Sequence, residues 1–169
     1  MDSDETLIAE YRRGSRQAFE ELFARYREPM YGFFRRRLDS RERAEDLTQE
    51  TFLAVIRGAA RWEPRALVRT WLYGIALKLL YSERRKLKRT GPPADLAAGG
   101  SPENAMWVRQ ALAKLGETER EILMLREYEQ LDYAEIADLL RIPVNTVRSR
   151  LSRARMAMRD CLKGEASHV

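Results

Sequence analysis

The stretch YAEIADLLRIPVNTVRSRLSRARMAMR, residues 133–159, contains two helical patterns separated by a turn. Asp132, followed three residues later by Glu135, predicts a capping box that opens a helix ending near Leu140. Pro143 favours the first turn of the next helix, where its missing N–H removes no hydrogen bond. The stretch therefore predicts two helices joined by a tight turn.

The second of these helices, expected from Val144 to Met158 or Arg159, has two chemically different sides. At ~100° per residue, one side is apolar and consists of Val147, Leu151, Ala154 and Met158. The opposite side is polar and consists of Asn145, Arg148, Ser149 and Ser152, flanked by Arg153, Arg155 and Arg159. Short polar side chains and arginines on a helix can contact base edges and phosphates in the major groove. The pattern predicts a DNA-binding helix-turn-helix.

Charge around this motif is polarised. Residues 107–140 contain four Lys/Arg and eight Asp/Glu, a net charge of −4, whereas residues 141–163 contain seven Lys/Arg and one Asp, a net charge of +6. A plain solvated helix in a bundle, the alternative interpretation, would show even mixing of the two signs. The 169-residue chain has a net charge of +5, so the local concentration of positive charge indicates nucleic acid more strongly than the total does.

Helical spacing of apolar residues recurs along the whole chain, and strand patterns are nearly absent, so the expected fold class is all-α. One segment interrupts it: TGPPADLAAGGSPENA, residues 90–105, is rich in Gly, Pro and Ala and is typical of a linker. We expect two small helical domains, residues 1–90 and 107–163, a flexible linker over 91–106, and a tail over 164–169.

Composition excludes several classes of function. One cysteine and one histidine, Cys161 and His168, cannot build a disulfide framework, a zinc cluster or a His-based catalytic set. The N-terminal residues are acidic, unlike a signal peptide, and the most apolar run, residues 71–81, is too short to span a bilayer. We expect no metal, cofactor or enzymatic activity, no membrane insertion, and a cytoplasmic location.

Residues 41–62, RERAEDLTQETFLAVIRGAARW, predict a helix with an apolar arc and a charged face. The expected apolar arc is Ala44, Leu47, Thr51, Phe52, Val55 and Ile56. The other face carries Asp46, Gln49, Glu50, Leu53 and Arg57. A leucine on a charged face can mark a protein contact, although single exposed leucines are common.

Residues 62–89 combine an apolar helical stripe with a basic end, RRKLKR. The stripe consists of Trp71, Leu72, Ile75, Ala76, Leu79 and Leu80, with Trp71 expected in the core. Trp62, Tyr73 and Tyr81 are interleaved with basic residues. Aromatic faces stack on unpaired bases while basic side chains follow the backbone, so this segment suits single-stranded nucleic acid, with core packing as the alternative.

Three stretches resemble bacterial sigma factors, especially the compact extracytoplasmic-function (ECF) group. Residues 125–159 resemble the fourth sigma region, residues 44–57 (AEDLTQETFLAVIR) the second, and residues 14–38 the opening helices of that second region. The middle region of longer sigma factors is replaced by the expected linker. Two matching motifs in the right order are more specific than either alone.

The resemblance implies an initiation factor that brings core RNA polymerase to promoters. The polymerase contact through the clamp coiled coil falls on Asp46, Gln49, Glu50, Leu53 and Arg57, with a second contact to the flap. Downstream-element reading and melting fall on Trp62, Glu63, Arg65, Leu67, Lys78, Ser82, Arg84 and Arg85, with residues 63–67 holding a flipped-out base. Upstream-element reading falls on Asn145, Thr146, Arg148, Ser149, Ser152 and Arg153. An anti-sigma factor is expected to cover the polymerase-facing surfaces.

The chain departs from the family at four positions. Arg141 and Asn145 replace common glycines, and a left-handed residue at 141 would cost on the order of 1 kcal/mol. Gly116 replaces a usual proline at a helix start. Lys78 replaces a common asparagine and favours phosphate or a guanine edge.

Two other functions remain open from the sequence. An autonomous helix-turn-helix regulator would act as a dimer on a palindromic site. An enzyme acting on nucleic acid would need a metal cluster, a Gly-rich phosphate loop or a nucleophile beside a base, and none is evident.

A linker of the expected length reaches roughly 20 Å, so we expect the two domains to need polymerase as a scaffold to span a promoter.

Overall fold

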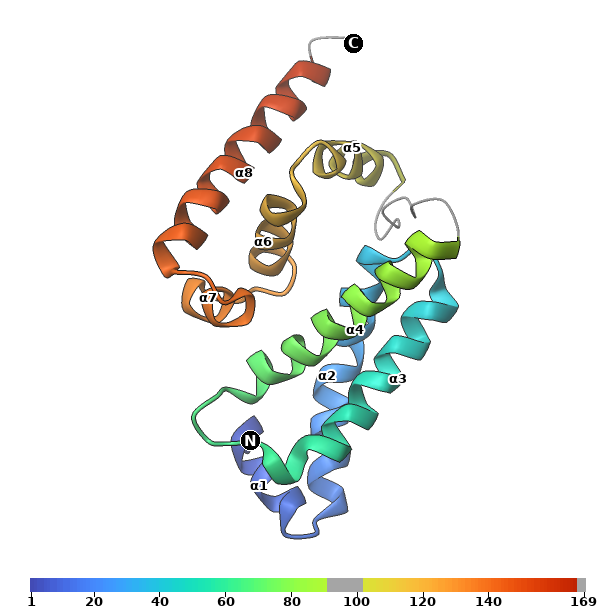
Figure 1. Ribbon diagram of the computed structural model, residues 1–169, viewed down its shortest axis with the longest axis vertical. Coiled ribbons are helices and arrows are strands. Elements are labelled where there is room, and N and C mark those ends of the chain that lie inside the picture. The colour runs from blue at the N-terminus through green and yellow to red at the C-terminus, as the bar shows by residue number, and fades with distance from the viewer. Residues whose placement is uncertain (91–101, 167–169) are drawn as a thin grey trace. The chain divides into compact units, whose positions relative to one another are not determined.

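The computed structural model describes residues 1–90 and 102–166 (Figure 1). These residues form eight α-helices and one short 3-10 helix and contain no strand, which confirms the predicted all-α class. The chain divides into two compact units, Met1–Ala97 and Ala98–Val169. Each unit has its own core and is described separately.

The first unit begins three of its helices on serine. Ser3, Ser15 and Ser40 each accept a hydrogen bond from the backbone N–H three residues later, which satisfies one free donor at the helix start. The helices are α1 (Asp4–Arg12), α2 (Arg16–Arg37), α3 (Arg41–Gly58), η1 (Ala59–Arg61) and α4 (Val68–Thr90). Figure 1 shows α2, α3 and α4 side by side, and all three contact one another.

Apolar side chains from all four α-helices fill the core of the first unit. Phe33 and Phe34 of α2 are fully buried and meet edge to face, and Phe33 also contacts Tyr73 of α4. Other fully buried side chains of this unit include Leu7, Ile8, Leu22, Met30, Leu38, Leu47, Leu72 and Leu80. Each such side chain contributes about 1.5–3 kcal/mol relative to an exposed position. This shared core therefore fixes the positions of α3 and α4 relative to each other.

The stripe predicted for α4 is partly wrong. Leu72, Ala76 and Leu80 are buried as expected, but Trp71, Ile75 and Leu79 are only half-buried. Tyr73 and Leu77, outside the predicted stripe, are buried instead. Helix α4 packs against both α2 and α3, and this second contact turns the buried arc by about one residue relative to the expected stripe.

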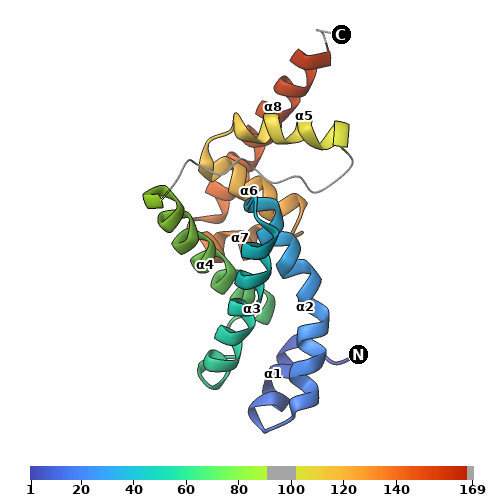
Figure 2. The same ribbon diagram turned by 90° about the vertical axis from the view of Figure 1, so that its right-hand side faces the viewer.

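The second unit consists of α5 (Pro102–Ala113), α6 (Glu117–Glu127), α7 (Tyr133–Leu140) and α8 (Val144–Ala166). Helices α5, α6 and α7 all pack on α8, and α5 crosses α8 in Figure 2. The capping box is present: Asp132 accepts from the Glu135 N–H, and the Glu135 side chain accepts from the Asp132 N–H, both at 2.8 Å. The predicted helix-turn-helix is therefore formed by α7 and α8.

Two helix ends differ from expectation. Helix α5 begins at Pro102, inside the linker expected over 91–106, because a proline in the first helical position loses no hydrogen bond. The preceding residues 91–101 lie outside the described part. Helix α8 continues to Ala166, past its expected end at 158 or 159 and into the expected tail. In the added turns of α8, Leu162 lines an apolar groove together with Val108 of α5. Helix α5 thus gives the end of α8 an apolar partner.

The turn between α7 and α8 is strained. Arg141 has φ 55° and ψ 48°, the left-handed conformation, and its N–H closes the end of α7. The left-handed conformation considered for this position is therefore present, and a non-glycine side chain in it costs about 1–2 kcal/mol. Gly116, another of the four family departures, caps α6 with φ −58°, a conformation that does not require glycine.

Candidate nucleic-acid and protein interfaces

The predicted polar residues of α8 lie together on one exposed side of the helix, here called the α8 polar face. Asn145, Arg148, Ser149, Ser152 and Arg153 are exposed, and Thr146 is half-buried. Val147, Leu151 and Ala154 are at most 1% exposed on the opposite side, as predicted, whereas Met158 is half-buried. The α8 polar face is therefore available to a ligand while the rest of the helix is anchored.

Helices α7 and α6 contact the side chains of Arg148 and Arg155 on α8. Arg148 lies 6.0 Å from the centroid of the Tyr133 ring at the start of α7. Ser149 donates its hydroxyl to the Thr146 carbonyl at 3.1 Å, so its oxygen remains free to accept. Arg155, predicted to flank the DNA side, instead donates to Glu127 of α6 at 2.8 Å. That hydrogen bond raises the pKa of Arg155 and commits it to the unit's own packing.

Helix α3 exposes a mixed apolar and charged surface, here called the α3 face. Gln49, Glu50 and Arg57 are exposed and Asp46 is half-buried, as predicted. Leu53 is 47% exposed. Ile56, which was predicted to be in the core, is 43% exposed. Ile56 lies seven residues, or two turns, after Gln49, and this spacing could have placed it on the exposed side. The face thus contains two adjacent apolar side chains instead of one.

Arg43 of α3 and Glu83 of α4 join these helices beside the α3 face. The guanidinium donates to both carboxylate oxygens, at 2.7 and 2.6 Å, and also to Asp46 at 3.1 Å. Glu83 is buried, and its hydrogen bonds from Arg43 hold its pKa below the ordinary value. Sequence reasoning missed this pair because the partners are 40 residues apart and neither belongs to a recognisable motif.

The segment between η1 and α4, here called the 62–67 loop, borders a pocket of about 560 Å³. The pocket walls come from the end of α3, from η1, from the loop and from the first turn of α4. Arg57, Arg61, Trp62, Glu63, Arg65 and Trp71 line it. Glu63 and Arg65 form an exposed ion pair, and Leu67 is 52% exposed. The structure thus gathers most of the predicted loop residues around one hollow.

Three of the aromatic residues in the 62–67 loop and α4 do not lie where the sequence predicted. Trp62 and Tyr73, expected to stack on bases, are only 7% and 3% exposed. Trp71, expected in the core, is half-buried and lines the pocket. Tyr81 is exposed. The alternation of aromatic and basic residues in the sequence could not show which rings are buried, because burial depends on which elements pack against α4.

Basic side chains follow the outer side of α4. Lys78 and Arg85 are exposed, and Ser82 and Arg84 are half-buried. Lys86, Lys88 and Arg89 extend the same series toward the end of the helix. A positively charged helix next to a pocket with an aromatic wall suits an anionic strand whose bases can leave the stack.

The second unit contains an apolar groove between α5, α6 and α8, of about 540 Å³. Its floor consists of Val108, Leu112, Leu123, Met124, Met158 and Leu162. Glu127, Arg155, Arg159 and Lys163 lie at its charged edge. Sequence reasoning did not identify the groove, because its walls come from three helices that are separate in sequence.

In residues 1–90 and 102–166, no three His, Cys, Asp or Glu side chains come together as a possible metal-ligand set. No helix in the described ranges combines the length and the apolar composition needed to cross a bilayer.

Comparison with known proteins identifies both units. Residues 22–90 match the profile of Sigma-70 region 2, and residues 105–158 match Sigma-70 region 4. The RNA polymerase sigma-H factor of Pseudomonas aeruginosa is 31% identical over 184 residues, covering 96% of this chain and 95% of that protein. The ECF RNA polymerase sigma-E factor of Haemophilus influenzae is 30% identical, covering 90% and 92%.

The chain belongs to the ECF sigma factors. The fold of this sigma factor agrees: CnrH, solved in complex with the cytosolic domain of CnrY, superimposes with a TM-score of 0.79 at 26% identity, covering 96% of this chain and 99% of that one. RpoE of Bartonella quintana, solved with the anti-sigma factor NepR, shares the fold with a TM-score of 0.74 at 23% identity, covering 86% and 96%.

Family membership decides between the functions left open by the sequence. Sigma factors are transcription initiation factors that bind core RNA polymerase and promoter DNA, and they are not known as enzymes. The autonomous dimeric regulator is therefore not favoured for this sigma factor.

Proposed function

We propose that this sigma factor divides promoter recognition among three surfaces: the α3 face docks on polymerase, the 62–67 loop with α4 reads and opens the downstream element, and the α8 polar face reads the upstream element. One observation carries the proposal. Regions 2 and 4 occur in order in one chain. In the helix-turn-helix of region 4, helix α8 exposes polar side chains on the side opposite its buried residues.

The α3 face suits a helical protein partner. Leu53 and Ile56 supply apolar surface, and Gln49, Glu50 and Arg57 surround them with groups of both signs. Interfaces commonly place an apolar centre inside a polar rim. The clamp coiled coil of core polymerase is the partner that we assign to it.

The pocket beside the 62–67 loop suits a base that has left the duplex. Trp71 offers an aromatic ring for stacking, and Arg61 and Arg65 offer charge for the backbone. Flipping a base costs a few kcal/mol, and stacking on an aromatic ring recovers about 1–3 kcal/mol. Lys78 and the basic end of α4 would follow the strand beyond the pocket.

The α8 polar face suits the major groove of the upstream element. Arg148 can donate to a guanine edge and Asn145 to an adenine edge, while Arg153 can hold a phosphate. A proposed second polymerase contact uses the apolar groove of the same unit, whose volume and apolar floor fit an amphipathic helix of the flap.

We also propose cytoplasmic control by an anti-sigma factor. CnrH, related in fold and sequence, is held in complex with the cytosolic domain of CnrY. Exposed apolar side chains of the α3 face and the apolar groove are surfaces that polymerase and such an inhibitor would compete for. A captured protein from the host should therefore block association with core polymerase; capture without competition would contradict this part.

Run-off transcription on genomic fragments tests the main proposal, with core polymerase in the presence and absence of the protein. Discrete transcripts that depend on the protein are expected. Leu53→Asp should abolish them, because a buried, unpaired carboxylate at the docking surface is costly. Glu20→Ala, at an exposed ion pair on α2, is the matched control that should retain them. Protein-independent transcription, or tight sequence-specific binding of the free protein to promoter DNA, would overturn the proposal.

A further inference from the structure

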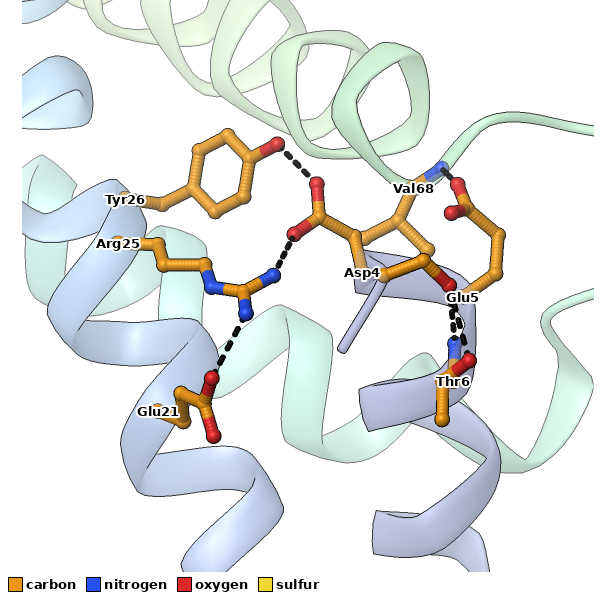
Figure 3. A network of polar contacts seen from close by, with 8 residues as sticks. Asp4, Glu5, Thr6, Glu21, Arg25, Tyr26 and Val68 are labelled. Carbon is orange, nitrogen blue, oxygen red and sulfur yellow. Dashed lines mark hydrogen bonds and ion pairs between the residues drawn. The ribbon is translucent and has the colours of Figure 1, made fainter. Parts of the chain in front are cut away.

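Helix α1 contacts both ends of the 62–67 loop. On the N-terminal side of the loop, the Arg12 guanidinium donates to the carbonyl oxygens of Trp62 at 3.4 Å and Ala60 at 3.3 Å. On the C-terminal side, a Glu5 carboxylate oxygen accepts from the N–H of Val68 at 3.0 Å. Figure 3 shows the carboxylate of Glu5 directed at the Val68 nitrogen.

We infer that Glu5 and Arg12 are positioning residues that hold the 62–67 loop in the shape that reads the downstream promoter base. The inference rests on the proposed role of that loop and extends it to α1. Helix α1 precedes residues 22–90, the part of the chain that matches the Sigma-70 region 2 profile.

Glu5 acts at the first turn of α4. The first N–H groups of a helix have no partner within the helix, and the preceding residue, Leu67, has no side-chain acceptor. The Glu5 carboxylate supplies one from 63 residues away, and its negative charge is favoured at the positive end of the helix dipole. Because Trp71 lies in the same first turn of α4, the contact also helps to set the pocket wall.

The loop itself contains little that could fix it. Residues 63–67 are all exposed, and their internal bonds are the Glu63–Arg65 ion pair and a turn in which the Ala66 N–H donates to the Glu63 carbonyl at 3.3 Å. Ordering exposed side chains on binding costs about 0.5–1.5 kcal/mol each. Fixing both ends of the loop in advance lowers that cost and narrows the range of bases that fit.

Helix α1 is itself anchored, as such a role requires. Leu7 and Ile8 are at most 1% exposed. Beside Glu5, Asp4 accepts from Arg25 at 3.0 Å and from the Tyr26 hydroxyl, both on α2 (Figure 3). Burial, together with the Asp4 carboxylate, raises the pKa of Tyr26, so its hydroxyl remains a donor in alkaline as well as neutral solution. Glu5 is therefore presented from a fixed helix.

The test is base discrimination by the holoenzyme at the mapped promoter. Four templates carry each base in turn at the downstream position that the wild type reads, and the readout is the ratio of run-off transcript between the preferred base and the others. The ratio is insensitive to the folded fraction, because one protein sample serves all templates. Glu5→Ala should lower the ratio about five- to tenfold and Arg12→Ala about two- to threefold.

Three controls make the outcome decisive. Glu5→Gln retains an acceptor for the Val68 N–H and should stay within about twofold of the wild type. Glu20→Ala removes the same charge from an exposed position and should leave the ratio unchanged. Discrimination at the upstream element should be unaffected by all four variants.

The possible failures can be told apart. If the wild type discriminates and Glu5→Ala discriminates equally well, the inference about α1 is wrong while the proposed function stands. A uniform fall on all four templates would also overturn it, because that indicates a folding defect alone. If the wild type supports no promoter-dependent transcription, the proposed function fails first and the inference with it.

Discussion

The α8 polar face and the 62–67 loop are both proposed to read DNA, but they are built differently. The α8 polar face is one side of one helix, whose opposite side is buried through Val147, Leu151 and Ala154. The 62–67 loop takes its pocket walls from α3, η1 and α4 and its end contacts from α1. A helix face carries its order within itself, whereas a loop depends on distant residues to fix it.

The largest expected effect tests whether the α8 polar face depends only on its own unit. Leu151→Ala should destabilise the second unit by about 2–5 kcal/mol, because a fully buried leucine leaves a cavity. Hydrogen exchange followed by mass spectrometry should show lost protection in α6–α8 and none in α1–α4. Ser152→Ala, at the exposed neighbouring position, should change stability by less than about 0.5 kcal/mol. Equal loss in both units would contradict their independence.

Arg148→Ala tests reading by the helix face. Loss of a bidentate base contact costs about 1–3 kcal/mol, or about five- to 150-fold in recognition. Run-off transcription on templates with altered upstream elements should therefore lose discrimination at one base pair. Discrimination at the downstream element should not change. An equal loss at both elements would mean that Arg148 supports the holoenzyme in some other way.

Trp71→Ala is the corresponding change at the pocket. It removes the aromatic wall and should weaken downstream opening by about 1–3 kcal/mol. The fluorescence of a 2-aminopurine placed at the flipped position reports the opening directly. Trp71→Phe retains a stacking face and should keep most of the signal. A phenylalanine variant as defective as the alanine variant would argue against stacking.

Acid sensitivity should belong to the first unit through Glu83. Its pKa is lower in the folded protein than in the unfolded chain, so its contribution is present above the ordinary value of 4.5 and is lost as pH falls through the folded pKa. Glu83→Gln should cost about 1–2 kcal/mol near pH 7. Urea unfolding from pH 6 to pH 3 should show this difference shrinking. A constant difference across that range would refute the assignment.

Arg141→Gly should give the smallest effect and a gain in stability. Glycine adopts the left-handed conformation without a side-chain penalty, so the second unit should be stabilised by about 1 kcal/mol. Thermal unfolding followed by circular dichroism measures the shift. Arg141→Ala keeps the penalty and should show no gain, which separates backbone strain from loss of the arginine charge.

The same contrast explains which features could be predicted from sequence. The α7 capping box, the turn and the buried side of α8 followed from residues no more than four apart, and they were confirmed except that Met158 is only half-buried. Ile56, Tyr73 and Trp71 were misplaced because two neighbouring helices decide which part of α3 or α4 is buried. Predicted contacts with polymerase and DNA remain predictions for the experiments above.

The local sequence of this protein determined its helices and its helix-turn-helix, because hydrogen-bond capping and helical periodicity act over one to four residues. Tertiary structure alone decided the pocket beside the 62–67 loop, the Arg43–Glu83 pair and the contacts of Glu5 and Arg12 with that loop. Those contacts join residues 40 to 63 positions apart. Only a packed core brings such groups within hydrogen-bonding distance, and no local pattern records where they will meet.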